Sequence, residues 1–83
     1  AQDGMLLIEK TGGKVVNSNP SAENMLGYSN RSLQNKKLWE LGILKDEQHF
    51  RQTAFDLEEK GIVNLPDRSI PNQGGGNFTA DIA

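Results

Sequence analysis

The sequence predicts an α+β fold with an antiparallel sheet. Two short strand-like stretches on either side of a glycine-containing turn open the chain, helix-start and helix-stop signals occupy its middle, and extended segments follow the last predicted helix. Strands and helices that are segregated along a chain are typical of α+β folds. At 83 residues the chain has room for one domain, 1–83, whose core needs nearly every large apolar side chain available.

The first predicted element is a β-hairpin. Residues 5–8 form an uninterrupted apolar run, and a second strand over residues 14–18 follows Gly12 and Gly13, which can adopt the positive φ of a tight reversal. Because successive side chains of a strand point to opposite faces, the apolar run predicts that both faces of the first strand are covered. The core of the domain accounts for one face, so the other face needs a different cover.

Two short helices are expected next. Asn19 and Pro20 predict a helix start, because the asparagine side chain can accept from a free backbone amide and proline at the first helical position loses no hydrogen bond. Gly27 predicts the end of this helix after about two turns. Ser29 predicts the cap of a second helix that runs through Leu33. The apolar face of the first helix comprises Ala22, Met25 and Leu26.

The longest predicted helix spans residues 46–60. Phe50, Ala54 and Leu57 recur there at helical spacing, acidic residues stand at the start, and a glycine follows the last residue. Residues 38–44, which precede this helix, carry apolar side chains of mixed periodicity. We interpret them as one helical turn and a loop.

Extended structure is predicted for the C-terminal part. Residues 62–70 have the pattern of a strand, although Pro66 cannot donate to a sheet ladder and indicates a bulge or an edge. A flexible turn is expected over residues 71–76, and residues 78–82 begin another strand by alternation.

Composition argues against several classes of function. Basic residues are scattered among acidic ones at a net charge of −2, so no basic stripe could follow the phosphates of a nucleic acid. No apolar stretch approaches the roughly 20 residues needed to cross a bilayer, and we expect no direct contact with a membrane. The chain has no cysteine, hence no disulfide and no thiolate metal site, and the cytoplasm is the expected compartment.

Several motifs in succession resemble the PAS family. They are Asp3-Gly4 before the first apolar strand, Asn17-Ser18-Asn19-Pro20-Ser21-Ala22, Leu26-Gly27-Tyr28-Ser29 and Leu38-Trp39-Glu40-Leu41. Over nearly its whole length the chain is similar to the sensory-box PAS domains of prokaryotic signal-transduction proteins such as sensor histidine kinases. The resemblance implies a five-stranded antiparallel sheet with short helices and one longer helix packed on one face, and a pocket between helices and sheet.

The end of the sequence departs from that pattern. PAS domains carry a fifth strand between the first and the fourth, whereas this chain stops after roughly the fourth. A vacant position would leave two rows of backbone donors and acceptors unpaired. We therefore expect the chain to be a fragment truncated before its final strand, or that strand to be disordered or supplied by another molecule.

Large apolar side chains of the predicted helices and of the third strand are the candidates for lining a ligand pocket. They are Met25, Trp39, Leu41, Ile43, Phe50, Ala54, Leu57, Val63 and Leu65. The alternative, which we favour for a domain of this size, is that these side chains fill the space themselves, because an empty apolar cavity sacrifices packing contacts.

His49 is the only histidine of the chain. In some PAS domains a histidine on the longest helix binds haem iron, so the resemblance makes His49 a candidate haem ligand. A histidine beside acidic residues at a helix start is more often solvated. The absence of cysteine excludes covalent flavin binding but leaves noncovalent flavin open, and our first expectation is that no cofactor is bound.

These features predict a sensory and dimerisation module that regulates a covalently linked output domain. The resemblance implies a histidine kinase or a cyclic-dinucleotide enzyme as that domain. The uninterrupted first strand motivates a homodimer formed through the outer face of the sheet. The alternative function is a receptor with a definite small molecule between helices and sheet. A free-standing enzyme is disfavoured, because no catalytic constellation is recognisable.

Overall fold

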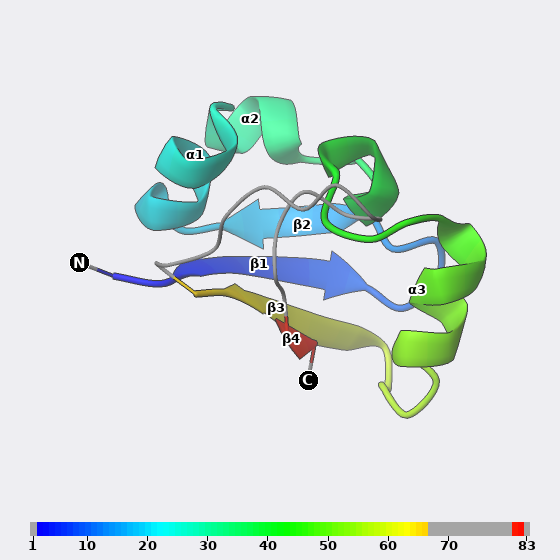
Figure 1. Ribbon diagram of the computed structural model, residues 1–83. Coiled ribbons are helices and arrows are strands. Elements are labelled where there is room, and N and C mark those ends of the chain that lie inside the picture. Colours follow the sequence, from blue (N-terminus) through cyan, green and yellow to red (C-terminus); the bar gives the residue numbers. More distant parts are fainter. Residues whose placement is uncertain (1, 67–80, 83) are drawn as a thin grey trace.

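The computed structural model describes residues 2–66 and 81–82 of the chain (Figure 1). In chain order the elements are β1 (Gly4–Glu9), β2 (Val15–Ser18), α1 (Pro20–Leu26), α2 (Asn30–Leu33), the 3-10 helix η1 (Leu38–Leu41), α3 (Glu47–Thr53), β3 (Lys60–Leu65) and β4 (Asp81–Ile82). The predicted α+β fold with an antiparallel sheet is therefore confirmed, with short helices between its second and third strands.

The sheet has the order β2-β1-β3-β4, and every neighbouring pair is antiparallel. β1 is central, pairing with β2 on one side and with β3 on the other. Leu7 illustrates this position, because it lies opposite Asn17 of β2 and opposite Ile62 of β3. The register of β1 against β2 shifts between Leu7 and Ile8, which marks a β-bulge. β4 is only two residues long and pairs with Val63 and Asn64.

A vacant strand position was expected between the first and the fourth strand, but β3 lies there and pairs directly with β1. The two strands pair over their whole length, from Gly4 opposite Leu65 to Glu9 opposite Lys60. No other described strand lies between them, and both sides of β1 have a hydrogen-bonding neighbour. The described sheet consequently satisfies β1 without a fifth strand.

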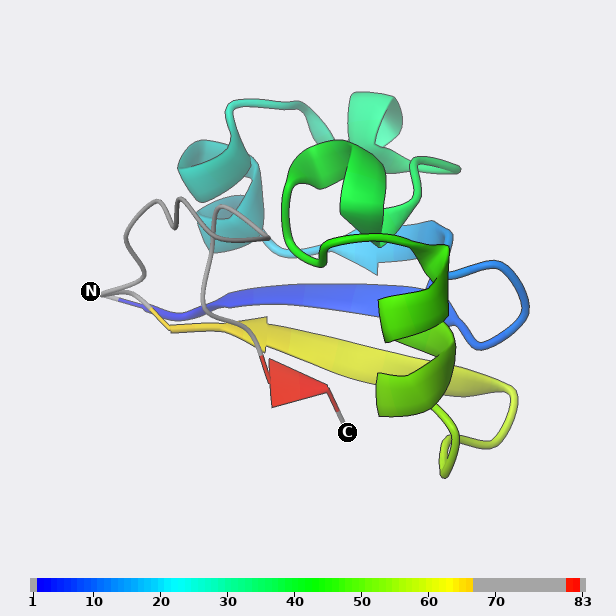
Figure 2. The ribbon, with the colours of Figure 1, turned by 45° about the vertical axis from the view of Figure 1, so that its right-hand side comes forward.

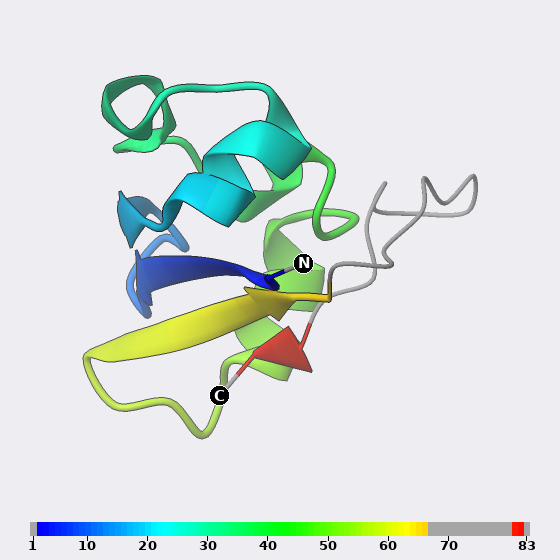
Figure 3. The same cartoon turned by 90° about the vertical axis from the view of Figure 1, so that its left-hand side faces the viewer.

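The helices lie on one side of the sheet. α1 packs against β1, α2 packs against β2, and α3 contacts η1. Figure 2 shows α3 crossing in front of β1 and β3, and Figure 3 shows the same layers from the side. In the part of the chain that the structure describes, no helix has the length and apolar character required to span a bilayer.

The helix signals of the sequence work as predicted for α1 and α2. The Asn19 side chain accepts from the backbone amide of Ala22, Pro20 stands in the first turn, and Gly27 ends α1 in the left-handed conformation at φ 77°. The hydroxyl of Ser29 accepts from the amide of Ser32 at the start of α2. Local chemistry thus fixes where these two helices begin and where α1 stops.

The helix predicted over residues 46–60 is shorter than expected. α3 ends at Thr53, and the segment that follows turns instead of continuing the helix. The turn, closed by a hydrogen bond from the Leu57 amide to the Ala54 carbonyl, lets the chain reverse. The Glu59 carbonyl then accepts from the amide of Lys10, and β3 begins at the next residue. Tertiary pairing therefore overrides the helical periodicity of this segment.

The C-terminal predictions are covered only in part. β3 ends at Leu65, just before Pro66, whereas the rest of the strand predicted over residues 62–70 lies outside the described residues. The turn expected over residues 71–76 also lies outside them. Of the strand expected over residues 78–82, the structure describes the two residues of β4.

The edge of β2 that faces away from β1 has hydrogen-bonding partners at both of its ends. In the first half, the Val15 amide donates to the carbonyl of Lys36, and the Val15 carbonyl accepts from the amide of Asn35. In the second half, the side-chain amide of Asn30 donates to the carbonyl of Ser18 at 3.1 Å and to its hydroxyl at 2.8 Å. A loop and one side chain thus take the place of a further strand.

One apolar core lies between the sheet and the helices. Leu6 and Ile8 of β1 are fully buried at its base, and Phe50 of α3 belongs to the same buried cluster. The ring of Phe50 lies 6.0 Å from the ring of Trp39, tilted by 50°. Gly13 of the hairpin turn, at φ +64°, packs against both rings, and a Cβ atom there would lie 3.1 Å from Trp39.

This packing predicts unequal effects of alanine at the two turn glycines. Both have positive φ, so either substitution costs about 1–2 kcal/mol of conformational strain. A Cβ at Gly12 meets nothing within 4 Å, whereas at Gly13 it lies 3.2 Å from the Phe50 ring. Gly13→Ala is expected to lose a further 1–3 kcal/mol or so through overpacking. Urea unfolding of both variants measures the difference in the free energy of unfolding. Equal losses would show that the two aromatic rings can shift to accommodate the added methyl group without cost.

Candidate functional site

The structure brings all nine predicted pocket residues together in the core. Six are buried, namely Leu41, Ile43, Phe50, Ala54, Val63 and Leu65, and three are partly buried and pack against the same cluster, namely Met25, Trp39 and Leu57. They come from α1, η1, α3 and β3 and from the two segments that flank α3. The apolar pattern of the sequence therefore identified neighbours in space.

Most of these side chains are closed off from solvent and belong to one cluster. Ile43, Phe50 and Ala54 are each no more than 2% exposed, and Val63 and Leu65 are not exposed at all. No polar or charged residue is buried among the described residues. Ligand pockets combine an apolar lining with a few convergent polar groups that fix the orientation of the ligand. The described core lacks such groups and has the character of a packed interior.

Trp39 is one of the three candidates that are only partly buried. Its ring stacks obliquely on Phe50 inside the core, and the ammonium of Lys37 lies 5.7 Å from the ring centroid. A lysine over an aromatic face interacts favourably with the electrons of the ring. The Lys37 side chain therefore covers the Trp39 ring where it leaves the core.

His49 lies outside this cluster. It is exposed on α3, where its backbone amide donates to the Asp46 carboxylate at 2.8 Å. It borders a surface depression of about 340 Å³ whose other lining residues are Lys45, Asp46, Gln48 and Gln52. A haem needs an apolar enclosure beside its ligand, and these polar side chains do not provide one. The described surroundings of His49 do not fit haem.

Metal binding finds no support elsewhere in the described residues. Within residues 2–66 and 81–82, no three acidic or histidine side chains gather as a metal site would require. The ion pair that joins Arg51 to Glu47 at 3.0 Å lies on the exposed side of α3. An exposed pair one helical turn apart adds only about 0.3–0.5 kcal/mol of stability.

The most distinctive surface lies on the opposite side of the sheet from the helices. The side chains of β1 alternate, with Leu6 and Ile8 in the core and Met5 and Leu7 on the other face. Ile62 of β3 lies beside Leu7 on that face. Met5 is 42% exposed and Ile62 is 44% exposed, while Leu7 is half-buried. We refer to the surface formed by Met5, Leu7 and Ile62 as the outer face.

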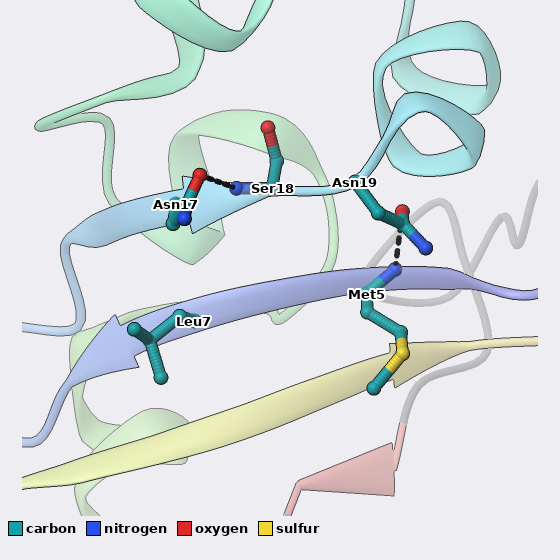
Figure 4. A pocket seen from close by; sticks show the side chains of 5 residues that line it. All are labelled: Met5, Leu7, Asn17, Ser18 and Asn19. Carbon is teal, nitrogen blue, oxygen red and sulfur yellow. Dashed lines mark hydrogen bonds between the residues drawn. The ribbon is translucent and has the colours of Figure 1, made fainter.

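Polar residues border the outer face. Asn17 lies opposite Leu7, and Asn64 lies opposite Met5. Between β1 and the end of β2 the surface is hollowed to a shallow depression of about 200 Å³, lined by Met5, Leu7, Asn17, Ser18 and Asn19 (Figure 4). The outer face is thus an apolar strip with an amide-rich margin.

The candidate pocket residues derived from the sequence did not include the outer face. The signal was nevertheless present, because the uninterrupted apolar run over residues 5–8 predicted a first strand covered on both faces. In the described residues only the face toward the helices is covered. Met5 and Leu7 are the part of that run that the chain leaves accessible.

Comparison of the chain with protein-family models, curated proteins and solved structures finds no match.

The contrast between the core and the exposed side of α3 gives a direct test. Phe50→Ala is expected to lower the free energy of unfolding by about 3–5 kcal/mol, since it leaves a cavity beneath Trp39. His49→Ala, one residue earlier and exposed, is expected to change it by less than about 0.5 kcal/mol. Urea unfolding measures both, and Phe50→Leu serves as a milder variant. A loss below about 1 kcal/mol for Phe50→Ala would indicate a loosely filled pocket instead of a packed core.

Proposed function

We propose that the chain is a PAS-type regulatory module that associates with a second copy of itself through the outer face and has no catalytic role of its own. The observation that carries this proposal is that β1 has apolar side chains on both of its faces. Its buried side chains form the base of the core, and its remaining apolar side chains, Met5 and Leu7, face solvent.

An apolar strip on a sheet suits a symmetric contact. In a two-fold dimer the same surface patch of both copies meets, so the strip of one copy covers the strip of the other. Met5, Leu7 and Ile62 would form the dry centre of this contact, and the amides of Asn17 and Asn64 would stand at its polar margin. This division into an apolar centre and a polar rim is typical of protein interfaces.

The same strand offers a route for regulation. Leu6 and Ile8 contact the helix side of the domain, while Leu7 between them belongs to the outer face. Protein interiors are close-packed, so a change in helix packing cannot be absorbed without a shift of the strand beneath it. A shift of β1 alters the outer face directly. Under this proposal a linked output domain, such as a histidine kinase, responds to that change.

The burial of the candidate residues, with no polar group buried among the described residues, supports protein contact ahead of small-molecule binding as the activity of this module. The nine pocket candidates pack on one another, and the described depressions on the surface are lined by other residues. A receptor function would require some of these side chains to move aside for the ligand. Mass spectrometry of gently purified chain under native conditions detects any such ligand as added mass.

Charge placed on the outer face is expected to weaken self-association. Ile62→Lys introduces an ammonium at the centre of the apolar contact, and its burial against a second copy is costly unless it is paired. Sedimentation equilibrium should show a concentration-dependent dimer for the unaltered chain and at least a tenfold or so larger dissociation constant for the variant, which corresponds to about 1.4 kcal/mol.

Phe55→Lys is the matched control for this experiment. Phe55 is 76% exposed, more than Ile62, but it stands in the turn after α3 and outside the sheet. Its replacement removes as much exposed apolar surface without touching the outer face, so the dimer should persist. A chain that remains monomeric at millimolar concentration, or two variants that weaken association equally, would refute the proposed contact.

A further inference from the structure

Asn19 stands where β2 gives way to α1, and each of its polar atoms is engaged. Its backbone amide donates to the Met5 carbonyl at 3.1 Å, and its backbone carbonyl accepts from the Glu23 amide at 3.2 Å. Its side-chain oxygen accepts from the amides of Met5 and Ala22, both at 2.9 Å. Its side-chain nitrogen donates to the Asp3 carbonyl at 3.1 Å. Figure 4 shows the bond between Asn19 and Met5.

Through these bonds a single residue completes a pair of the β1–β2 ladder and also accepts the first hydrogen bond of α1. In an ordinary antiparallel ladder, a residue opposite Met5 would donate its amide and accept with its own carbonyl. Asn19 donates its amide in this way, but its side-chain oxygen replaces the carbonyl as acceptor for the Met5 amide. The carbonyl is therefore free to accept the first bond of α1. The ladder thus extends one pair beyond β2 while the helix has already begun.

The start of β1 and α1 are also in direct contact. A Cβ atom at Gly4 would lie 3.0 Å from Cα of Ala22 and 2.9 Å from the sulfur of Met25, so the strand backbone approaches the helix as closely as glycine allows. Gly4 and Ala22 are both buried. Steric contact thus resists compression of this junction, whereas the Asn19 bonds resist its separation.

We infer that Asn19 couples α1 to the start of β1, so that the helix and residues 3–5 move as one unit. An ordinary helix cap satisfies a helix amide and nothing else. Asn19 satisfies a helix amide and a strand amide with the same oxygen atom, so the side chain cannot follow one without leaving the other. A displacement of α1 is thereby passed to the strand that carries the outer face. This coupling does not depend on whether the chain dimerises.

The test perturbs α1 at a distance and reads the response at Met5. Asn24 is exposed on α1, and alanine and glycine at this position differ by about 1 kcal/mol in helix propensity, hence about fivefold in local opening. Native-state hydrogen exchange of the full chain compares Asn24→Ala with Asn24→Gly. The amides of Glu23 and Gly27 report on α1, the Met5 amide reports on the strand, and the Val63 amide corrects for global stability.

The coupling predicts that exchange at Met5 rises with exchange in α1, by about three- to fivefold between the two variants. In an Asn19→Ser background the shorter hydroxyl can cap α1 but cannot also reach Met5, so the Met5 response should fall below about twofold. Asn19→Asp keeps both acceptor bonds and should keep the response. A Met5 amide that ignores Asn24 in the unaltered background, or that responds equally in the serine background, would overturn the inference.

Discussion

The structure depends on the position of β1. This strand is hydrogen-bonded on both sides and contributes the fully buried Leu6 and Ile8 to the base of the core. None of the helices within residues 2–66 exceeds seven residues, and helices of that length are not stable in water by themselves. They persist because their apolar side chains pack against the inner face of the sheet. Helix formation therefore depends on the paired sheet.

Elements defined by local chemistry could be predicted from the sequence. Asn19 and Gly27 bound α1 as expected, because a cap and a left-handed turn involve only neighbouring residues. The end of α3 could not be predicted, since apolar spacing continues to Leu57 and the reversal is imposed by pairing of Glu59 with Lys10. The pairing of β1 with β3 joins residues that lie far apart in the sequence, from Glu9 with Lys60 to Gly4 with Leu65, and no local signal specifies it.

For the candidate site, too, some features could be predicted from the local sequence and others depend on tertiary structure. Membership of the core could be predicted, because helical and strand periodicity place Phe50 and Val63 on inward faces. Whether such residues surround a cavity or fill it depends on how side chains from four elements interdigitate. The periodicity of the sequence carries no information about this packing. The accessibility of Met5 and Leu7 likewise depends on tertiary structure, because the apolar run over residues 5–8 does not reveal that no described helix or strand covers its second face.

The amide of Asn30 at the end of β2 has a consequence for solubility. An uncovered strand edge presents a row of free donors and acceptors and can template fibrous aggregation. Because the Asn30 side chain occupies the carbonyl and hydroxyl of Ser18, a foreign strand would have to displace it before adding to β2. Gln34 in turn holds the Asn30 amide in place through a 2.9 Å bond to its oxygen. The domain can thus expose an apolar sheet surface while discouraging runaway growth along this side.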